Sequence, residues 1–109
     1  MTTPGKLVRD RIPEIVAERG HRATTRRLEP SERLPALLAK LDEETAELRE
    51  ADGLDHQAEE IADVHEVLLA IATELGLAWD DIERIAADKR AERGGFEQGV
   101  WMVTESDDA

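Results

Sequence analysis

The sequence contains no cysteine, which excludes disulfide bonds and thiolate metal sites and fits a reducing compartment. It has no tyrosine, one phenylalanine and two tryptophans, so its core must be built from Leu, Ile, Val and Ala, as in helix bundles. No apolar run approaches the roughly 18 residues of a membrane span. The N-terminal region, with Arg9, Asp10 and Arg11, also lacks a secretory signal. We therefore expect a cytoplasmic protein without a membrane partner.

Basic residues are scarce as well. Fourteen Lys and Arg stand against 26 Asp and Glu, which gives a formal charge of −12. Such a surplus repels phosphate backbones, so we expect no nucleic-acid partner. The acids are concentrated between residues 34 and 88, whereas bases prevail before residue 34. With 109 residues the chain can bury one modest core. We expect a single domain, 1–109, that is stabilised by oligomerisation.

The apolar pattern predicts an all-α, mainly helical bundle. A short helix is expected from about Pro13 to Gly20, since Pro suits a first turn and Gly a C-terminal cap. From about Ser31 to Ala51 an amphipathic helix is expected, with Pro35 in its first turn. Its leucines, which fall within roughly 60° of one direction, are Leu34, Leu37, Leu38, Leu41 and Leu48.

A second long helix is expected at about 55–75, joined to the first by a tight turn. Gly53 is expected to cap the end of the first helix, and Asp55 to cap the start of the second. Gly76 should end the second helix. Its apolar residues, spaced for an antiparallel helix hairpin, are Ile61, Val64, Leu68, Ile71 and Leu75.

A third helix is expected to begin near Asp80 or Asp81 and to stop at Gly94-Gly95. Two further segments suggest extended structure. Residues 21–30 include β-branched and basic residues and close with Pro30, which predicts an extended segment or a short strand. Residues 96–105 are expected to form a short terminal strand that pairs with residues 21–28.

Two acidic pairs occupy positions next to the apolar stripes of the hairpin. Glu44 and Glu47 are three residues apart, as are Glu60 and Asp63, so each pair shares a helix face. An antiparallel fold about Gly53 places Glu47 opposite Glu60 and Glu44 opposite Asp63, with a height mismatch of roughly 1.5 Å. Glu44 and Glu60 point toward the partner helix on the helical wheel.

Partial burial of so much like charge is costly unless protons or cations neutralise it. Oxygen-only ligands suit Mg²⁺ or Mn²⁺. The alternative is that these acids lie on solvated helix faces, where a single acidic pair means little. The histidines show no ligand spacing and are expected on surfaces or helix faces; they are His21, His56 and His65.

Three sequence elements in order resemble one known superfamily. "EETAE" (43–47) followed by "EIAD" (60–63) resembles the EExxE…ExxD signature of the MazG-like all-α nucleoside triphosphate pyrophosphohydrolases. "DKRAERGGF" (88–96) is similar to the Lys-x-x-x-Arg-Gly-Gly-Phe element of that superfamily. "KLVRDRIPEIV" (6–16) resembles the opening of its small bacterial and phage house-cleaning branch.

The resemblance implies hydrolysis of a nucleoside triphosphate between the α and β phosphates, which gives a monophosphate and pyrophosphate. The substrate is expected to be a non-standard or surplus nucleotide, and the chain a homodimer or higher homo-oligomer. Mg²⁺, with Mn²⁺ as a substitute, would be held by the four acids of the signature, which are Glu44, Glu47, Glu60 and Asp63. Metal ions can neutralise triphosphate oxygens and activate water.

Three further residues receive candidate roles from the resemblance. Glu43 is a candidate for activating water, although a solvated face position is the alternative. Lys89 and Arg93 share a helix face and are candidates for catalysis and for binding substrate phosphates. Their alternative role is to stabilise the C-terminal end of the helix dipole.

The N-terminal segment 6–16 contains three basic residues, Lys6, Arg9 and Arg11. They either contact phosphates or form ion pairs with the acidic middle of the chain, and we prefer the ion pairs. Trp79 is expected to pack at a helix start, and Trp101 in a core or dimer interface. Two other functions stay open. One is phosphoribosyl-ATP pyrophosphohydrolase activity in histidine biosynthesis, and the other is a catalytically silent helical dimer that binds nucleotides or proteins.

Overall fold

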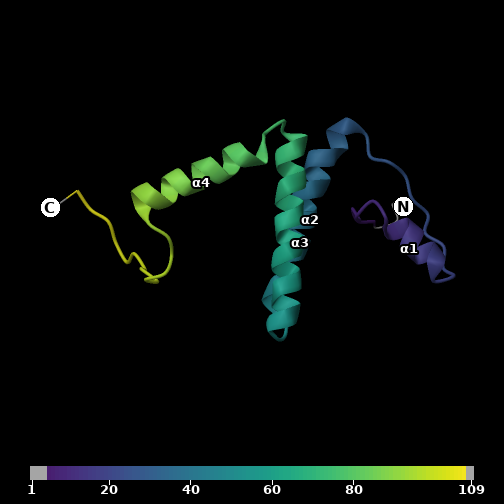
Figure 1. Ribbon diagram of the computed structural model, residues 1–109, viewed down its shortest axis with the longest axis horizontal. Helices are drawn as coiled ribbons and strands as arrows, with labels where there is room; N and C mark the ends of the chain where they lie inside the picture. The colour runs from purple at the N-terminus through teal and green to yellow at the C-terminus, as the bar shows by residue number, and fades with distance from the viewer. Residues whose placement is uncertain (1–4, 108–109) are drawn as a thin grey trace. The chain divides into compact units, whose positions relative to one another are not determined.

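The structure of the protein is a computed structural model, which describes residues 5–107. Within this range the chain forms four α-helices and no strand (Figure 1), which confirms the all-α fold class. The helices are α1 (Ile12–Glu18), α2 (Pro30–Glu50), α3 (Leu54–Glu74) and α4 (Trp79–Arg93). The chain divides into two compact units, Met1–Leu77 and Ala78–Ala109, which are described separately below.

Helix α2 begins at a network of charged side chains. Glu29 is its N-cap residue, and the Glu29 backbone N–H donates to Glu32 Oε1 at 2.8 Å. The guanidinium of Arg26 donates to both oxygens of Glu32, at 3.0 and 2.9 Å. Pro30 occupies the first turn, where its missing N–H costs nothing. Pro35 lies inside the helix, beyond the first turn in which it was expected, and so removes one helical hydrogen bond.

The turn between α2 and α3 differs from the prediction in its capping residues. Ala51 is the C-cap of α2, and Gly53 is the N-cap of α3, so Asp55 lies inside the first turn of α3 and does not cap it. Gly53 has φ 90° and ψ 154°, which is backbone geometry open essentially to glycine alone. The glycine therefore starts α3 one residue earlier than expected.

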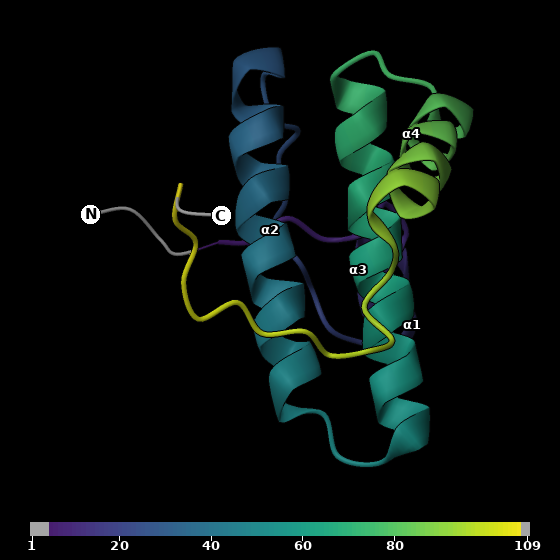
Figure 2. The same cartoon turned by 90° about the vertical axis from the view of Figure 1, so that its left-hand side faces the viewer.

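Helices α2 and α3 pack side by side and run antiparallel (Figures 1 and 2). Val67 and Ala72 of α3 are the buried apolar residues of the described chain, at 8% and 5% exposure. The predicted leucine stripe of α2 is half-buried except for Leu38. Val64 and Ile71 of α3 are half-buried as predicted.

The predicted seam of α3 is wrong for three residues. Ile61, Leu68 and Leu75 are 57%, 38% and 53% exposed. One neighbouring helix covers only part of the circumference of α3, and the face turned toward α2 carries Glu60 and Val67 in their place. The three residues follow one another at intervals of seven, so they form an uncovered apolar line along α3.

The second unit contains α4, which ends at Gly94 as predicted. The strand expected at 96–105 is wrong, and residues 21–28 form neither helix nor strand. A strand needs a ladder of backbone hydrogen bonds with a neighbour, and the described parts of these two segments have none. Several large apolar side chains of the second unit are more than 70% exposed, namely Phe96, Val100, Trp101, Met102 and Val103. No helix among the described residues is long and apolar enough to span a bilayer.

Candidate metal centre

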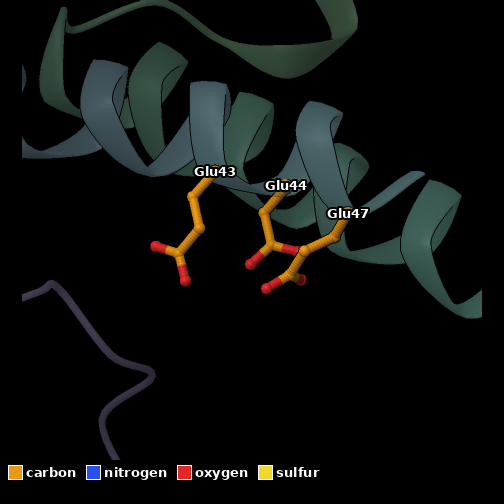
Figure 3. A group of neighbouring side chains, drawn as sticks. All are labelled: Glu43, Glu44 and Glu47. Atoms are coloured by element: carbon orange, nitrogen blue, oxygen red, sulfur yellow. The ribbon is translucent and has the colours of Figure 1, made fainter. Parts of the chain in front are cut away.

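Acidic side chains of α2 and α3 meet in two overlapping groups. Glu43, Glu44 and Glu47 extend from the same side of α2 (Figure 3), and each offers an oxygen within 4.8 Å of the others. Glu44, Glu60 and Asp63 form the second group with the same limit. Glu44 belongs to both groups, so the two acidic pairs read from the sequence form one continuous cluster.

Two members of the cluster are buried. Glu44 is 5% exposed and Glu60 is 8% exposed, so the predicted inward orientation of both is confirmed. Each has one oxygen beside a nitrogen: Glu44 Oε1 lies 3.3 Å from Lys40 Nζ, and Glu60 Oε1 lies 3.4 Å from His56 Nε2. The other oxygen of each, Oε2, is buried and has no hydrogen-bond partner. A buried carboxylate oxygen without a donor is costly.

The electrostatics around Glu60 reflect this crowding. Burial raises the pKa of the Glu60 carboxyl above its ordinary value, and the neighbouring carboxylates of Glu44, Glu47 and Asp63 raise the pKa further. A raised pKa means that the folded chain holds the charged form of Glu60 at a cost. A cation at this position would reverse that cost.

Lys40 is a member of the cluster that the sequence interpretation missed. Its ammonium lies 3.3 Å from Glu43 Oε2 and 3.3 Å from Glu44 Oε1, and only 15% of its side chain is exposed. Burial lowers the pKa of Lys40, but its hydrogen bonds to and attraction by the two glutamates outweigh burial and leave the pKa raised. The available signal was its spacing, because Lys40 precedes the two glutamates by three and four residues.

His56 is the second residue that was missed. Its Nδ1 accepts a hydrogen bond from the Asp52 backbone N–H at 3.4 Å. A neutral imidazole that accepts at Nδ1 carries its proton on Nε2, which is the nitrogen that faces Glu60. The turn therefore orients His56 toward a buried carboxylate. Its position four residues before Glu60 was the signal in the sequence.

The N-terminal segment reaches the cluster from outside the hairpin. Lys6 Nζ lies 3.4 Å from Glu43 Oε1, and Arg9 Nη2 donates to Asp63 Oδ1 at 2.6 Å. The preferred pairing with the acidic middle is thus confirmed for these two residues. Arg11 pairs instead with Glu14 of its own helix, at 3.1 Å.

The same contacts correct the interpretation of Glu43. The alternative that it lies on a solvated face is wrong, because Glu43 is half-buried and contacts the ammonium groups of Lys6 and Lys40.

The described charges of the cluster do not balance. Five carboxylates meet three cationic side chains, which leaves two negative charges when all acids are ionised. The acids are Glu43, Glu44, Glu47, Glu60 and Asp63, and the cations are Lys6, Arg9 and Lys40. The excess equals the charge of one divalent cation.

Lys89 and Arg93 lie on α4, in the second unit. Both side chains are exposed, and Arg93 belongs to the last turn of the helix. Their roles in catalysis and phosphate binding stay predictions. Trp79 begins α4, as expected, and its Nε1 donates to Glu83 Oε1 at 3.1 Å. Trp101 is 87% exposed, so it is not a core residue of this chain.

Comparison with known proteins assigns the chain to a class and then to a family. Residues 8–90 match the family model of phosphoribosyl-ATP pyrophosphohydrolase, and the all-α fold agrees with this class of protein. The chain belongs to this family, which confirms the superfamily resemblance. The match includes all five acids of the cluster and Lys89, whereas Lys6 and Arg93 lie outside it.

A relative in Mycolicibacterium smegmatis is an uncharacterised protein. It is 54% identical over 50 residues, which are 46% of this chain and 51% of the relative. The chain therefore matches about half the length of this curated relative. No solved structure matches the chain.

Proposed function

We propose that the protein hydrolyses a nucleoside triphosphate between its α and β phosphates and releases a nucleoside monophosphate and pyrophosphate. Mg²⁺ is the cofactor, with Mn²⁺ as a substitute, and its ligands are Glu44, Glu47, Glu60 and Asp63. Membership of a pyrophosphohydrolase family supports the class of reaction. The nucleoside triphosphate substrate and the metal are our proposal.

One observation carries this proposal: the buried, unpartnered Oε2 atoms of Glu44 and Glu60. Both belong to a group whose oxygens lie within 4.8 Å of one another, so a single small cation can contact several of them. Carboxylate oxygens are the donors that Mg²⁺ and Mn²⁺ prefer. The described residues therefore fit the cofactor.

When bound, the metal neutralises phosphate oxygens and lowers the pKa of a water molecule. The remaining steps fall to side chains. Glu43, held between Lys6 and Lys40, is the candidate acceptor for the proton of the attacking water. Lys89 and Arg93 are the candidates for balancing the charge that develops on the departing pyrophosphate. Arg93 offers a planar fork and Lys89 a point charge.

The choice of substrate rests on the opening segment. "KLVRDRIPEIV" resembles the house-cleaning branch, whose substrates are non-standard or surplus nucleotides. The second candidate is phosphoribosyl-ATP, which the matched family model names. Both substrates have the same bond cleaved, so a direct comparison of rates separates them.

The test is a panel of nucleoside and deoxynucleoside triphosphates together with phosphoribosyl-ATP, in Mg²⁺ and in EDTA. Release of pyrophosphate and of orthophosphate is followed separately. Glu44→Gln and Glu60→Gln are compared with Glu59→Gln, which changes the exposed neighbour of Glu60 in the same way.

We expect pyrophosphate release that requires Mg²⁺, is lost in the first two variants and persists in Glu59→Gln. Undiminished activity in Glu44→Gln and Glu60→Gln would refute the metal assignment. Orthophosphate as the product would refute the bond that is cleaved. Much faster turnover of phosphoribosyl-ATP than of any triphosphate would favour the second candidate.

We also propose that the functional protein is a homodimer or higher homo-oligomer. The apolar line of Ile61, Leu68 and Leu75 is uncovered, and only two apolar residues of the described chain are buried. So small a core is marginal for a chain of this length, because stability comes mainly from buried apolar surface. A second copy that covers this line would enlarge the core.

Analytical ultracentrifugation tests the assembly. We expect the parent chain to sediment as a dimer or larger and Leu68→Glu to shift toward the monomer, because the new charge would be placed in the interface. Glu66→Gln, a change at an exposed position of the same helix, serves as the control. A monomeric parent at micromolar concentration would refute the proposal.

A further inference from the structure

The N-terminal segment and the helical hairpin line an open cavity of about 230 Å³. Lys6, Val8, Arg9 and Ile12 line one side of the cavity. Lys40, Glu44 and Asp63 line the other side. In Figure 3 the N-terminal segment runs past the side of α2 to which the three glutamates point. Three cations and two acids thus line one space beside the candidate metal centre.

The ion pairs that join the N-terminal segment to the acidic cluster are easily exchanged. The side chains of Lys6 and Arg9 are 65% and 56% exposed, so water and salt screen their ion pairs with Glu43 and Asp63. Lys40 differs, since only 15% of its side chain is exposed. A divalent cation that binds the cluster would compete with the two exposed cations far more readily than with Lys40.

Apolar residues give the segment a second attachment. Val8 and Ile12 are half-buried and belong to the same cavity wall. The Ile12 backbone N–H donates to the Arg9 carbonyl oxygen at 3.0 Å, which ties Arg9 to the start of α1. The segment can therefore stay at the cluster when its two ion pairs open.

We propose that Lys6 and Arg9 form a phosphate latch: once divalent cations occupy the carboxylates, both side chains exchange Glu43 and Asp63 for phosphate oxygens of the nucleotide. The latch rests on the proposed function and deepens it by naming two binding residues for the polyphosphate. No bond is made or broken in this exchange.

The chemistry of the two side chains fits this role. A guanidinium donates two parallel hydrogen bonds to phosphate, and an ammonium supplies a compact charge. Without metal, the same side chains reduce the repulsion among the acids of the cluster. With metal and substrate, they face a new set of anionic oxygens at the same place. The latch thus keeps its two cations partnered in both states.

Calorimetric titration with inorganic pyrophosphate in Mg²⁺ tests the latch without requiring turnover. The variants are Arg9→Gln, Lys6→Gln and the conservative Arg9→Lys. Arg11→Gln is the matched control, because it removes an equal charge from a nearby residue whose ion pair, among the described residues, is with Glu14 of α1. Circular dichroism reports whether each variant keeps its helices.

We expect Arg9→Gln to weaken pyrophosphate binding about tenfold, which corresponds to the loss of one charge-assisted hydrogen bond. Lys6→Gln should weaken it severalfold, and Arg9→Lys should restore part of the loss. Arg11→Gln should bind like the parent. In a titration with Mg²⁺ and no pyrophosphate, the Mg²⁺ concentration at half-saturation should stay the same or fall in Arg9→Gln, because the guanidinium that competes for Asp63 is gone.

Equal pyrophosphate binding in the parent and in Arg9→Gln, or an equal loss in Arg11→Gln, overturns the latch. Steady-state kinetics separate this result from failure of the proposed function. If triphosphates are hydrolysed and their KM is unchanged in Arg9→Gln, the function stands and the latch fails. If no nucleotide is hydrolysed but pyrophosphate binding depends on Arg9, the function fails and the latch stands.

Discussion

Replacing Gly53 by alanine perturbs the turn that brings the two acidic helices together. At φ 90° and ψ 154° an added Cβ meets no atom within 4 Å, so the cost arises from the backbone alone. Holding a non-glycine residue in this region costs about 1–3 kcal/mol. Each kcal/mol shifts the Tm of a domain of 60–100 residues by about 4–8 °C, so a cost of about 2 kcal/mol lowers the Tm by about 8–16 °C.

The same substitution should weaken metal binding. If the chain relieves the strain by rebuilding the turn, α3 shifts along α2, and Glu60 and Asp63 move away from Glu44. Differential scanning calorimetry in EDTA measures the loss of stability, and titration with Mg²⁺ measures the loss of affinity. Gly20→Ala is the matched control, since Gly20 also has a positive φ, of 80°, and open space around it.

Gly20 follows α1, which has no buried residue, so its substitution should cost less stability and leave the Mg²⁺ midpoint unchanged. An unchanged Tm in Gly53→Ala would contradict the backbone argument. A loss of Mg²⁺ affinity in Gly20→Ala equal to that in Gly53→Ala would contradict the role of the turn in holding the two groups together.

Three further predictions concern stability. Burial and neighbouring acids raise the pKa of Glu60, so the metal-free protein gains stability as pH falls through that raised pKa. Glu60→Gln should therefore raise the Tm in EDTA more at pH 7, where Glu60 of the parent is charged, than at pH 5. The hydrogen bond from Arg26 lowers the pKa of Glu32 from 4.5 to about 2, so ionised Glu32 stabilises the fold above pH 4.5 and this stabilisation is lost as pH falls toward 2. Thermal melts across this range should show that Glu32→Gln has a lower Tm than the parent above pH 4.5 and that this difference disappears toward pH 2. Val67→Ala should cost about 1–3 kcal/mol in urea denaturation, whereas Leu54→Ala, at an 84% exposed position, should stay within about 0.5 kcal/mol of the parent.

The hairpin and the acidic cluster were predictable because both depend on short spacings. Leucines at helical intervals located α2, and acids three residues apart on either side of one turn located Glu44 and Glu60. The basic residues that contact these acids from the same helix could be predicted from the same helical spacing of three or four residues. Lys40 and His56 precede their acids by three or four residues, a spacing that places each pair on one helix face.

Other features depend on contacts that spacing does not encode. Residues 96–105 have the composition of a strand, but a strand exists only where another backbone accepts its hydrogen bonds. Ile61 and Leu75 have the spacing of a core seam, but their burial depends on how much of α3 its neighbour covers. The long-range pairs of Lys6 and Arg9 required knowledge of where the N-terminal segment crosses the hairpin.

The sharing of Glu44 between the two carboxylate groups restricts how this protein can change during evolution. A substitution at Glu47 or Asp63 alters one group and leaves the other with its three acids. A substitution at Glu44 removes a member from both groups at once and leaves Lys40 with one glutamate instead of two. Descendants that acquire a new substrate or metal preference are therefore expected to vary first at the two outer positions and last at Glu44.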